Sequence, residues 1–118
     1  MTQSLVAGLE PPYYTAVFTS LRSDDFTEVE GSAEAYAATN ARMHELVQDV
    51  PGFLGYESAR TPGGLGITVA YFRDLEGLAA WRREPEHAEA QRRGREEWYS
   101  AYSLHIGKVE RSHAFVRP

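Results

Sequence analysis

Side chains that can do chemistry lie close together in the run Trp81–His87 (WRREPEH), and Arg95 follows it. An indole stacks on flat aromatic molecules. An imidazole, whose ordinary pKa is ~6.5, accepts and returns a proton near neutral pH, and a guanidinium stabilises a nearby anion. We therefore take His87, Trp81 and Arg95 as candidate catalytic residues. The same residue types are also consistent with a core indole, a capping or surface imidazole and a salt-bridged guanidinium.

Further aromatic side chains in the predicted strands and the last helix are candidates for binding a substrate. A phenol or an indole can form a hydrogen bond while its ring stays in an apolar wall. Trp98 lies near one helical stripe with Gln91, Arg95 and Tyr102, a spacing that equally suits a core residue. The candidate substrate-binding residues are Tyr56, Tyr71, Trp98 and His105. His44 is expected at the surface.

Two Glu-x-x-His pairs, Glu84–His87 and Glu110–His113, raise the question of a metal site. Di-iron carboxylate sites need both pairs on helices and two further carboxylates. The second pair falls in a predicted strand, where residues three apart point to opposite faces. We expect no metal site and no bound cofactor.

The elements that must position these residues follow from hydrophobic spacing and turn formers. Residues 1–12 are predicted to form a flexible arm, and residues 13–118 a single domain. Strands are predicted at 13–21, 53–60, 65–73 and 103–115, with a loop at 22–31 and a hairpin turn at 61–64. Helices are predicted at 33–49, from the capping residue Asp74 to Arg83, and from Pro85 to about Tyr99.

The ends and interruptions of these elements carry further predictions. Ser32 is the expected N-cap of the first helix, with Glu34 in its first turn. Gly107, inside the last strand, suggests a bulge or a close approach of two backbones. On the outer face of the last helix, Glu89 and Arg93 have the spacing of a weak ion pair.

The order β-α-β-β-α-β, with the second helical position split in two, is typical of the ferredoxin-like arrangement. That fold class is α+β, a four-stranded antiparallel sheet with helices on one face. Both faces of the first and third strands carry apolar residues, whereas apolar and polar residues alternate along a strand that has one face in water. Because helices cover only one face, a second copy of the sheet is the expected cover of the other. We therefore predict a homodimer.

Composition limits the classes of function. The 118 residues are 42% hydrophobic and 25% charged, as in an ordinary globular domain. The absence of cysteine excludes disulfides, thiol nucleophiles and thiolate metal sites. A net charge of −5 disfavours binding to nucleic acid, and no apolar stretch is long enough for a membrane span. We expect a cytoplasmic protein that binds neither nucleic acid nor membrane.

The motifs, taken in order, resemble those of the antibiotic biosynthesis monooxygenase family, whose members are dimeric α+β barrels. The resemblance spans roughly residues 13 to 115. It rests on Pro-Gly-Phe-x-Gly-Tyr-Glu at 51–57, on Tyr71-Phe72-Arg73-Asp74, on Trp81 with His87, and on Gly94-Arg95-x-x-Trp98-Tyr99. It implies homodimers whose sheets face each other, with a pocket in each subunit between sheet and helices. Some members oxidise phenolic polyketide intermediates without metal or flavin, and others degrade haem.

The chain departs from both of these subgroups. The quinone-forming members pair the helix tryptophan with an asparagine one turn earlier, where this chain has Gly77. The haem-degrading members have an iron-binding histidine at the position of Gln91 and a strand-one asparagine, whereas residues 13–21 contain none. These departures disfavour haem degradation and leave the quinone-forming mechanism incomplete.

Two functions of different classes follow. The first is a cofactor-independent monooxygenase that oxidises a small electron-rich phenolic or polyketide-like aromatic molecule with dioxygen. In it, His87 accepts a proton, Trp81 forms an aromatic wall and Arg95 stabilises the substrate anion. The second is a non-redox protein that binds a small molecule or acts by acid–base chemistry, as a cyclase, isomerase or dehydratase does. A third hypothesis is a domain that forms dimers and catalyses no reaction. A requirement for dioxygen separates the first function from the second.

Overall fold

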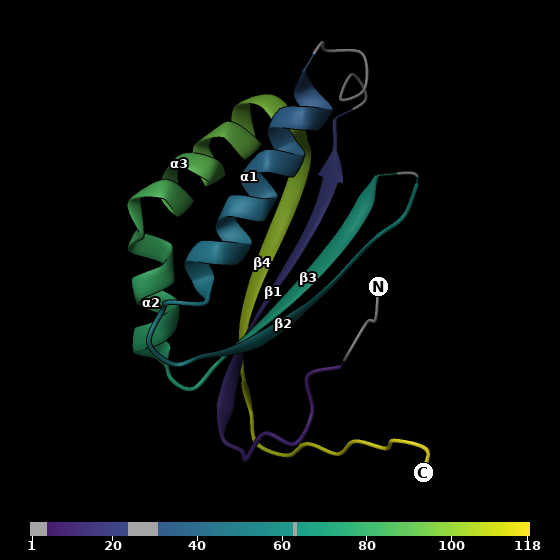
Figure 1. Ribbon diagram of the computed structural model, residues 1–118, viewed down its shortest axis with the longest axis vertical. Coiled ribbons are helices and arrows are strands. Elements are labelled where there is room, and N and C mark those ends of the chain that lie inside the picture. Colours follow the sequence, from purple (N-terminus) through teal and green to yellow (C-terminus); the bar gives the residue numbers. More distant parts are fainter. Residues whose placement is uncertain (1–4, 24–30, 63) are drawn as a thin grey trace.

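The computed structural model describes residues 5–23, 31–62 and 64–118. Within these residues, one antiparallel sheet has the strand order β2-β3-β1-β4. The strands are β1 (Tyr13–Arg22), β2 (Phe53–Arg60), β3 (Leu65–Phe72) and β4 (Tyr99–Val109). The helices α1 (Ser32–Val47), α2 (Leu75–Arg83) and α3 (Pro85–Arg93) cover one face of this sheet (Figure 1). The predicted ferredoxin-like α+β fold is confirmed.

The helix starts follow the capping residues with one exception. Asp74 accepts a hydrogen bond from the backbone N–H of Gly77 (2.8 Å) and caps α2 as predicted. The N-cap of α1 is Gly31, with a φ of 77°, and Ser32 is the first helical residue, so the prediction of a serine cap was wrong. A left-handed backbone at the cap suits glycine, which has no Cβ to clash there. The predicted loop 22–31 and turn 61–64 include residues 24–30 and 63, which lie outside the described residues.

The last helix and the last strand meet earlier than predicted. After α3 the chain forms a π-helical turn, η1 (Gly94–Trp98), and enters β4 directly at Tyr99. β4 ends at Val109, which pairs with Tyr13, the first residue of β1. Pro11 and Pro12 precede that residue and have no N–H to extend the ladder. The predicted strand 103–115 therefore starts and ends too late. Its expected bulge is not at Gly107 but at the other end, where the register shifts between Leu21 and Arg22.

The face of the sheet that no helix covers is largely apolar. Alternate residues of each strand point to it, and those of β1 and β3 include Val17, Leu21, Leu65, Ile67 and Val69. Leu21, Leu65 and Ile67 are 45%, 40% and 43% exposed. The predicted apolar character of both sheet faces is therefore present in the structure.

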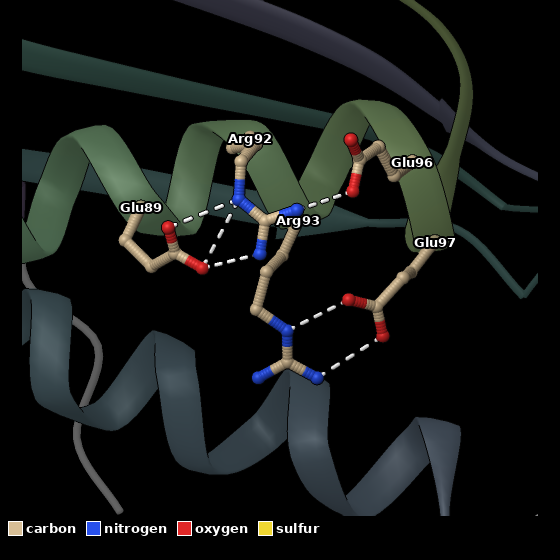
Figure 2. A network of polar contacts seen from close by, with 5 residues as sticks. All are labelled: Glu89, Arg92, Arg93, Glu96 and Glu97. Atoms are coloured by element: carbon tan, nitrogen blue, oxygen red, sulfur yellow. Dashed lines mark hydrogen bonds and ion pairs between the residues drawn. The ribbon is translucent and has the colours of Figure 1, made fainter.

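The outer face of α3 and η1 carries a network of ion pairs (Figure 2). Arg92 contacts both Glu89 and Glu96, and Arg93 forms a paired contact with Glu97. The predicted Glu89–Arg93 pair is replaced by these contacts. Most of these side chains are about half exposed, so solvent screens their charges and each pair contributes little to stability. Among the described residues, no helix has the length and apolar character needed to cross a membrane.

Candidate functional site

A cavity of about 840 Å³ lies between the helices and the sheet face that they cover. All four strands, the three α-helices and η1 contribute side chains to its wall. The volume is within the range of pockets that hold small organic ligands, ~300–1,000 Å³. Of the candidate residues from the sequence, the wall contains Trp81, His87, Arg95, Tyr56 and Trp98.

Trp81 and His87 meet at the junction between α2 and α3. Their rings are stacked, with centroids 3.8 Å apart and planes inclined by 12°. Glu84, between them, accepts a hydrogen bond from the backbone N–H of His87 (2.9 Å), and Pro85 fixes the first turn of α3. This local capping holds the imidazole over the indole.

The tautomer of His87 follows from its hydrogen bond. Nδ1 lies 2.8 Å from the backbone carbonyl oxygen of Trp81. A carbonyl oxygen only accepts, so Nδ1 carries the proton in the neutral imidazole and Nε2 is an acceptor. Burial lowers the pKa of His87, and the carbonyl of Trp81 and the charge of Glu84 oppose this effect only in part. The residue is therefore neutral near pH 7, with a nitrogen able to take a proton.

A second polar cluster in the cavity wall joins α1, β2 and β4. The Arg60 guanidinium donates to the hydroxyl oxygens of Ser20 (2.8 Å) and Tyr36 (3.1 Å) and to the carbonyl oxygen of Gly64 (2.6 Å). The Tyr99 hydroxyl donates to that of Tyr36 at 3.0 Å. The Tyr36 oxygen thus receives hydrogen bonds from a cation and from a second phenol.

These contacts shift the two phenols in opposite directions. Burial raises the pKa of Tyr36, but hydrogen bonds with Tyr99 and Asn40 and the charges of Arg60 and Arg22 outweigh it, so the net pKa lies below the usual value. Burial and the bond to Tyr36 raise the pKa of Tyr99. Tyr36 is the phenol of this pair that ionises first. Tyr36 is a site residue that the sequence patterns did not single out.

Tyr56 reaches the cavity because β2 is interrupted. The register with β3 shifts between Phe53 and Gly55, so Leu54 is an extra residue. Gly55 has a φ of 150°, and the shift brings both Phe53 and Tyr56 to the helix-covered face. The Tyr56 hydroxyl lies 2.5 Å from Nδ1 of His44, which is exposed as predicted and also lines the cavity. Burial raises the pKa of Tyr56.

The other candidate residues differ in their placement. Trp98 is buried, 2% exposed, and packs edge-on against Tyr36 with ring centroids 5.2 Å apart. Arg95 is exposed at the cavity wall, where Nη1 lies 3.4 Å from the hydroxyl of Tyr102. Tyr102 lies on β4, so the predicted helical stripe ends at Trp98.

Tyr71 and His105 do not reach the cavity, which corrects our assignment of both as pocket residues. His105 pairs with Val17 and Tyr71 with Thr15, on the sheet face without helices. Tyr71 instead donates a 2.6 Å hydrogen bond to Glu57, and burial and this carboxylate raise its pKa to about 12. Side chains alternate between the two faces of a strand, so a shift of one residue moves a side chain from one face of the sheet to the other.

Gly77 occupies the position at which the resemblance to the quinone-forming members implies an asparagine. A Cβ atom there would lie 2.7 Å from the carbonyl oxygen of Pro51 and 3.3 Å from the ring of Phe72. Real Cβ atoms do not approach a backbone oxygen this closely, so the close contact between α2 and the α1–β2 turn requires glycine. An asparagine at this position is incompatible with the observed packing.

The two Glu-x-x-His pairs have separate roles. Glu84 caps α3, whereas Glu110 and His113 follow the end of β4 and are exposed, not in a strand as predicted. In the described part of the chain, no group of three or more histidine, aspartate or glutamate side chains could hold a metal ion.

Comparisons with known proteins agree with this fold. The family model described as antibiotic biosynthesis monooxygenase matches residues 26–93. The chain is 41% identical over 106 residues to the uncharacterised protein YqjZ of Bacillus subtilis (strain 168), covering 90% of this chain and 87% of YqjZ. It is 27% identical over 82 residues to the jasmonate monooxygenase ABM of Pyricularia oryzae, covering 67% of this chain and 38% of that protein.

Among solved structures, the chain is similar to a mutant of SnoaB, a cofactor-independent oxygenase from Streptomyces nogalater. The TM-score is 0.66 at 13% identity, and the match covers 85% of this chain and 95% of that one. At this identity the likeness establishes a shared fold.

Proposed function

This chain belongs to the antibiotic biosynthesis monooxygenase family, and from that premise we propose that it is a cofactor-independent monooxygenase. Its substrate is a small electron-rich aromatic molecule, phenolic or polyketide-like, that fits a cavity of about 840 Å³. The observation that carries the proposal is the stacked Trp81–His87 pair in the cavity wall, with Nδ1 committed to a carbonyl and Nε2 left as an acceptor. The names of SnoaB and of the Pyricularia oryzae relative support oxygenation as the reaction class.

The proposed reaction needs only the substrate and dioxygen. For an anthrone-like substrate, a ring CH₂ group and O₂ give a ring carbonyl and water, so the substrate supplies all the electrons. Nε2 of His87 removes the first proton, and the resulting carbanion or phenolate passes an electron to dioxygen. Recombination gives a hydroperoxide, which loses water to form the carbonyl.

The protein contributes position, an aromatic wall and charge. The indole of Trp81 stacks on the substrate ring, and the neutral imidazole of His87 lies beside the indole, where it can take the proton. Arg95 at the rim provides a cation for the substrate anion. These are the roles expected of the three candidate catalytic residues.

Oxygen uptake tests the proposal directly. The metal-stripped protein is mixed with a panel of anthrones, hydroquinones and naphthols, beside a double variant with Trp81→Phe and His87→Ala. Uptake that requires the wild-type protein and no added cofactor supports a monooxygenase with its site at Trp81 and His87. Uptake no higher than that of the double variant, for every panel member, overturns the proposal.

The rate should depend on pH in the direction set by His87. Because burial lowers its pKa below the usual 6.5, His87 stays neutral at and above that value and loses its acceptor only at lower pH. The acid limb of kcat/KM should therefore have a midpoint below pH 6.5.

The same lowered pKa makes stability depend on pH. His87 binds protons less readily in the folded state than in the unfolded state, so its contribution to the free energy of unfolding is fully present above pH 6.5 and is lost as pH drops through the folded pKa. A His87→Gln variant should lose this part of the acid destabilisation in pH-dependent melting. An acid limb centred above 6.5 would contradict the assignment.

A second candidate function is favoured by Gly77. Without the asparagine of the quinone-forming subgroup, the cavity still offers a proton acceptor and two unequal phenols, Tyr36 and Tyr99. These groups suffice for a cyclisation, isomerisation or dehydration without dioxygen. Turnover of a panel member that proceeds equally well under argon would favour this function over the first.

A homodimer completes the proposal. The helix-free sheet face exposes apolar side chains of β1 and β3, and a second copy of that face would remove them from water. Ile67→Arg, on this face, should convert a dimer to a monomer in sedimentation velocity. Leu75→Arg, at an exposed position of α2 on the opposite side, should not. A wild-type protein that sediments as a monomer at micromolar concentration would contradict the dimer.

A further inference from the structure

The described residues of the cavity wall carry a charge opposite to that of the whole chain. Four arginines line it, Arg22, Arg60, Arg82 and Arg95, and none of its described lining residues is an aspartate or a glutamate. The chain as a whole carries a net charge of −5. Positive charge concentrated in a cleft of an acidic protein attracts anions to that cleft.

Arg60 is the arginine of this set whose position is most completely built. Its guanidinium donates to Ser20, Tyr36 and Gly64, which come from β1, α1 and the β2–β3 hairpin. It lies over Gly66, where an added Cβ atom would be only 2.4 Å from the Arg60 Cζ atom. The fold therefore holds the Arg60 guanidinium in a fixed position against the backbone of Gly66.

Among the described residues, the hydrogen-bond acceptors around Arg60 are all neutral. Ser20, which is 1% exposed, offers a hydroxyl, Gly64 a carbonyl and Tyr36 a phenol. These bonds do not use all of the N–H groups of a guanidinium. In the described ranges Arg60 forms no ion pair, whereas Arg92 and Arg93 on the outer face of α3 are matched by glutamates (Figure 2). A partly buried cation without a counter-charge is costly unless an anion joins it.

The location of this cluster relates it to the proposed reaction. Arg60 ends β2 beside the β2–β3 hairpin, whereas α2, which carries Trp81, follows the end of β3 that is opposite the hairpin (Figure 1). Both line the same cavity. A molecule that stacks on Trp81 can therefore extend along the cavity toward Arg60.

We propose that Arg60 binds the carboxylate of an aromatic acid, so that the substrate is acidic and enters with its carboxylate toward the β2–β3 hairpin. This assignment of the substrate class rests on the proposed function, because it takes the cavity to be the substrate site. Arginine suits the role because its planar guanidinium forms charge-assisted hydrogen bonds with carboxylates.

Binding of matched probes tests this proposal. 2-Naphthoate and 2-naphthamide have the same ring system and differ in charge, and both can be followed by quenching of tryptophan fluorescence, under argon and at fixed ionic strength. We expect the wild-type protein to bind the naphthoate about 10- to 100-fold more tightly than the amide. Equal affinities, or no binding of either probe at millimolar concentration, would overturn the proposal.

Variants show which residue causes the preference for naphthoate over naphthamide. Arg60→Gln should reduce the ratio of the two affinities to within about threefold. Gly66→Ala, which displaces the Arg60 guanidinium but keeps its charge, should also lower that ratio. Arg92→Gln, which removes a surface cation, is the matched control and should leave it unchanged. A preference that survives in folded Arg60→Gln, or that disappears only in Arg95→Gln, would place the carboxylate elsewhere and overturn the proposal. If Arg60→Gln does not fold, Gly66→Ala and the comparison of probes on the wild type decide the matter.

The outcome is separable from that of the oxygenase test. A naphthoate preference that depends on Arg60, together with no oxygen uptake on any substrate, would retain the acid-binding site and remove the monooxygenase. Oxygen uptake on neutral naphthols without any naphthoate preference would do the reverse.

Discussion

Replacing His87 by alanine should lower substrate-dependent oxygen uptake by ~10²–10⁴-fold, the usual effect of losing a general base. The reason is geometric: Nδ1 is bonded to the carbonyl of Trp81, so Nε2 is the nitrogen that can take the substrate proton. Burial keeps that nitrogen unprotonated near neutral pH. The measurement is kcat/KM for oxygen uptake with the best substrate of the panel.

A second histidine provides the control. His113→Ala changes an exposed residue beyond the end of β4 and should leave the rate within about twofold. Circular dichroism of both variants separates loss of chemistry from loss of fold. An unchanged rate in folded His87→Ala would remove His87 from the mechanism and leave Trp81 as a wall without an adjacent base.

Replacing Phe72 by alanine should lower the free energy of unfolding by ~3–5 kcal/mol, the cost of emptying a fully buried phenylalanine site. Phe72 is 0% exposed and packs edge-on against Phe53, with ring centroids 5.6 Å apart. Its ring also lies against Gly77 at the start of α2. The residue therefore links β2, β3 and the helix that presents Trp81.

Urea unfolding at a fixed protein concentration measures this effect, because the proposed dimer would make apparent stability depend on concentration. Phe115→Ala, a position that is 74% exposed, is the matched control and should change the free energy of unfolding by less than about 0.5 kcal/mol. A decrease of less than about 1 kcal/mol in the free energy of unfolding of Phe72→Ala would contradict this prediction. It would mean that the neighbouring rings move into the space left by the Phe72 side chain.

The fold could be predicted because its signals are local. The hairpin between β2 and β3 follows from a Pro-Gly-Gly turn between two runs of strand residues, and Asp74 marks the start of α2. The start of β4 could not be predicted in the same way. Tyr99 and Tyr102 continue the three- and four-residue spacing of the preceding helix, and the π-helical turn before Tyr99 has no distinctive residue pattern. Pairing with the far end of β1 decides the boundary instead.

The candidate site was predictable to the extent that it is local. Trp81 and His87 are six residues apart across one helix junction, so the sequence alone brings them together. Arg60 and Tyr36 are 24 residues apart, and their contact depends on how α1 lies on the sheet. His105 and Tyr71 depend on strand phase, which composition does not reveal when both faces are apolar. Gly55 was the available sign that β2 changes phase at Leu54.

The π-helical turn from Gly94 to Trp98 has a consequence for how proteins of this shape change over evolution. It joins α3 to β4 with no connecting loop, and a Cβ atom at Gly94 would lie 2.9 Å from the ring of Tyr99. Insertions accumulate where a chain has slack, at loop tips, and this wall of the cavity has none. Gln91, Arg95 and Tyr99 are therefore held at a constant spacing. New substrates must be accommodated here by exchanging side chains one at a time, whereas the β2–β3 hairpin, which adjoins the same end of β1, can change in length.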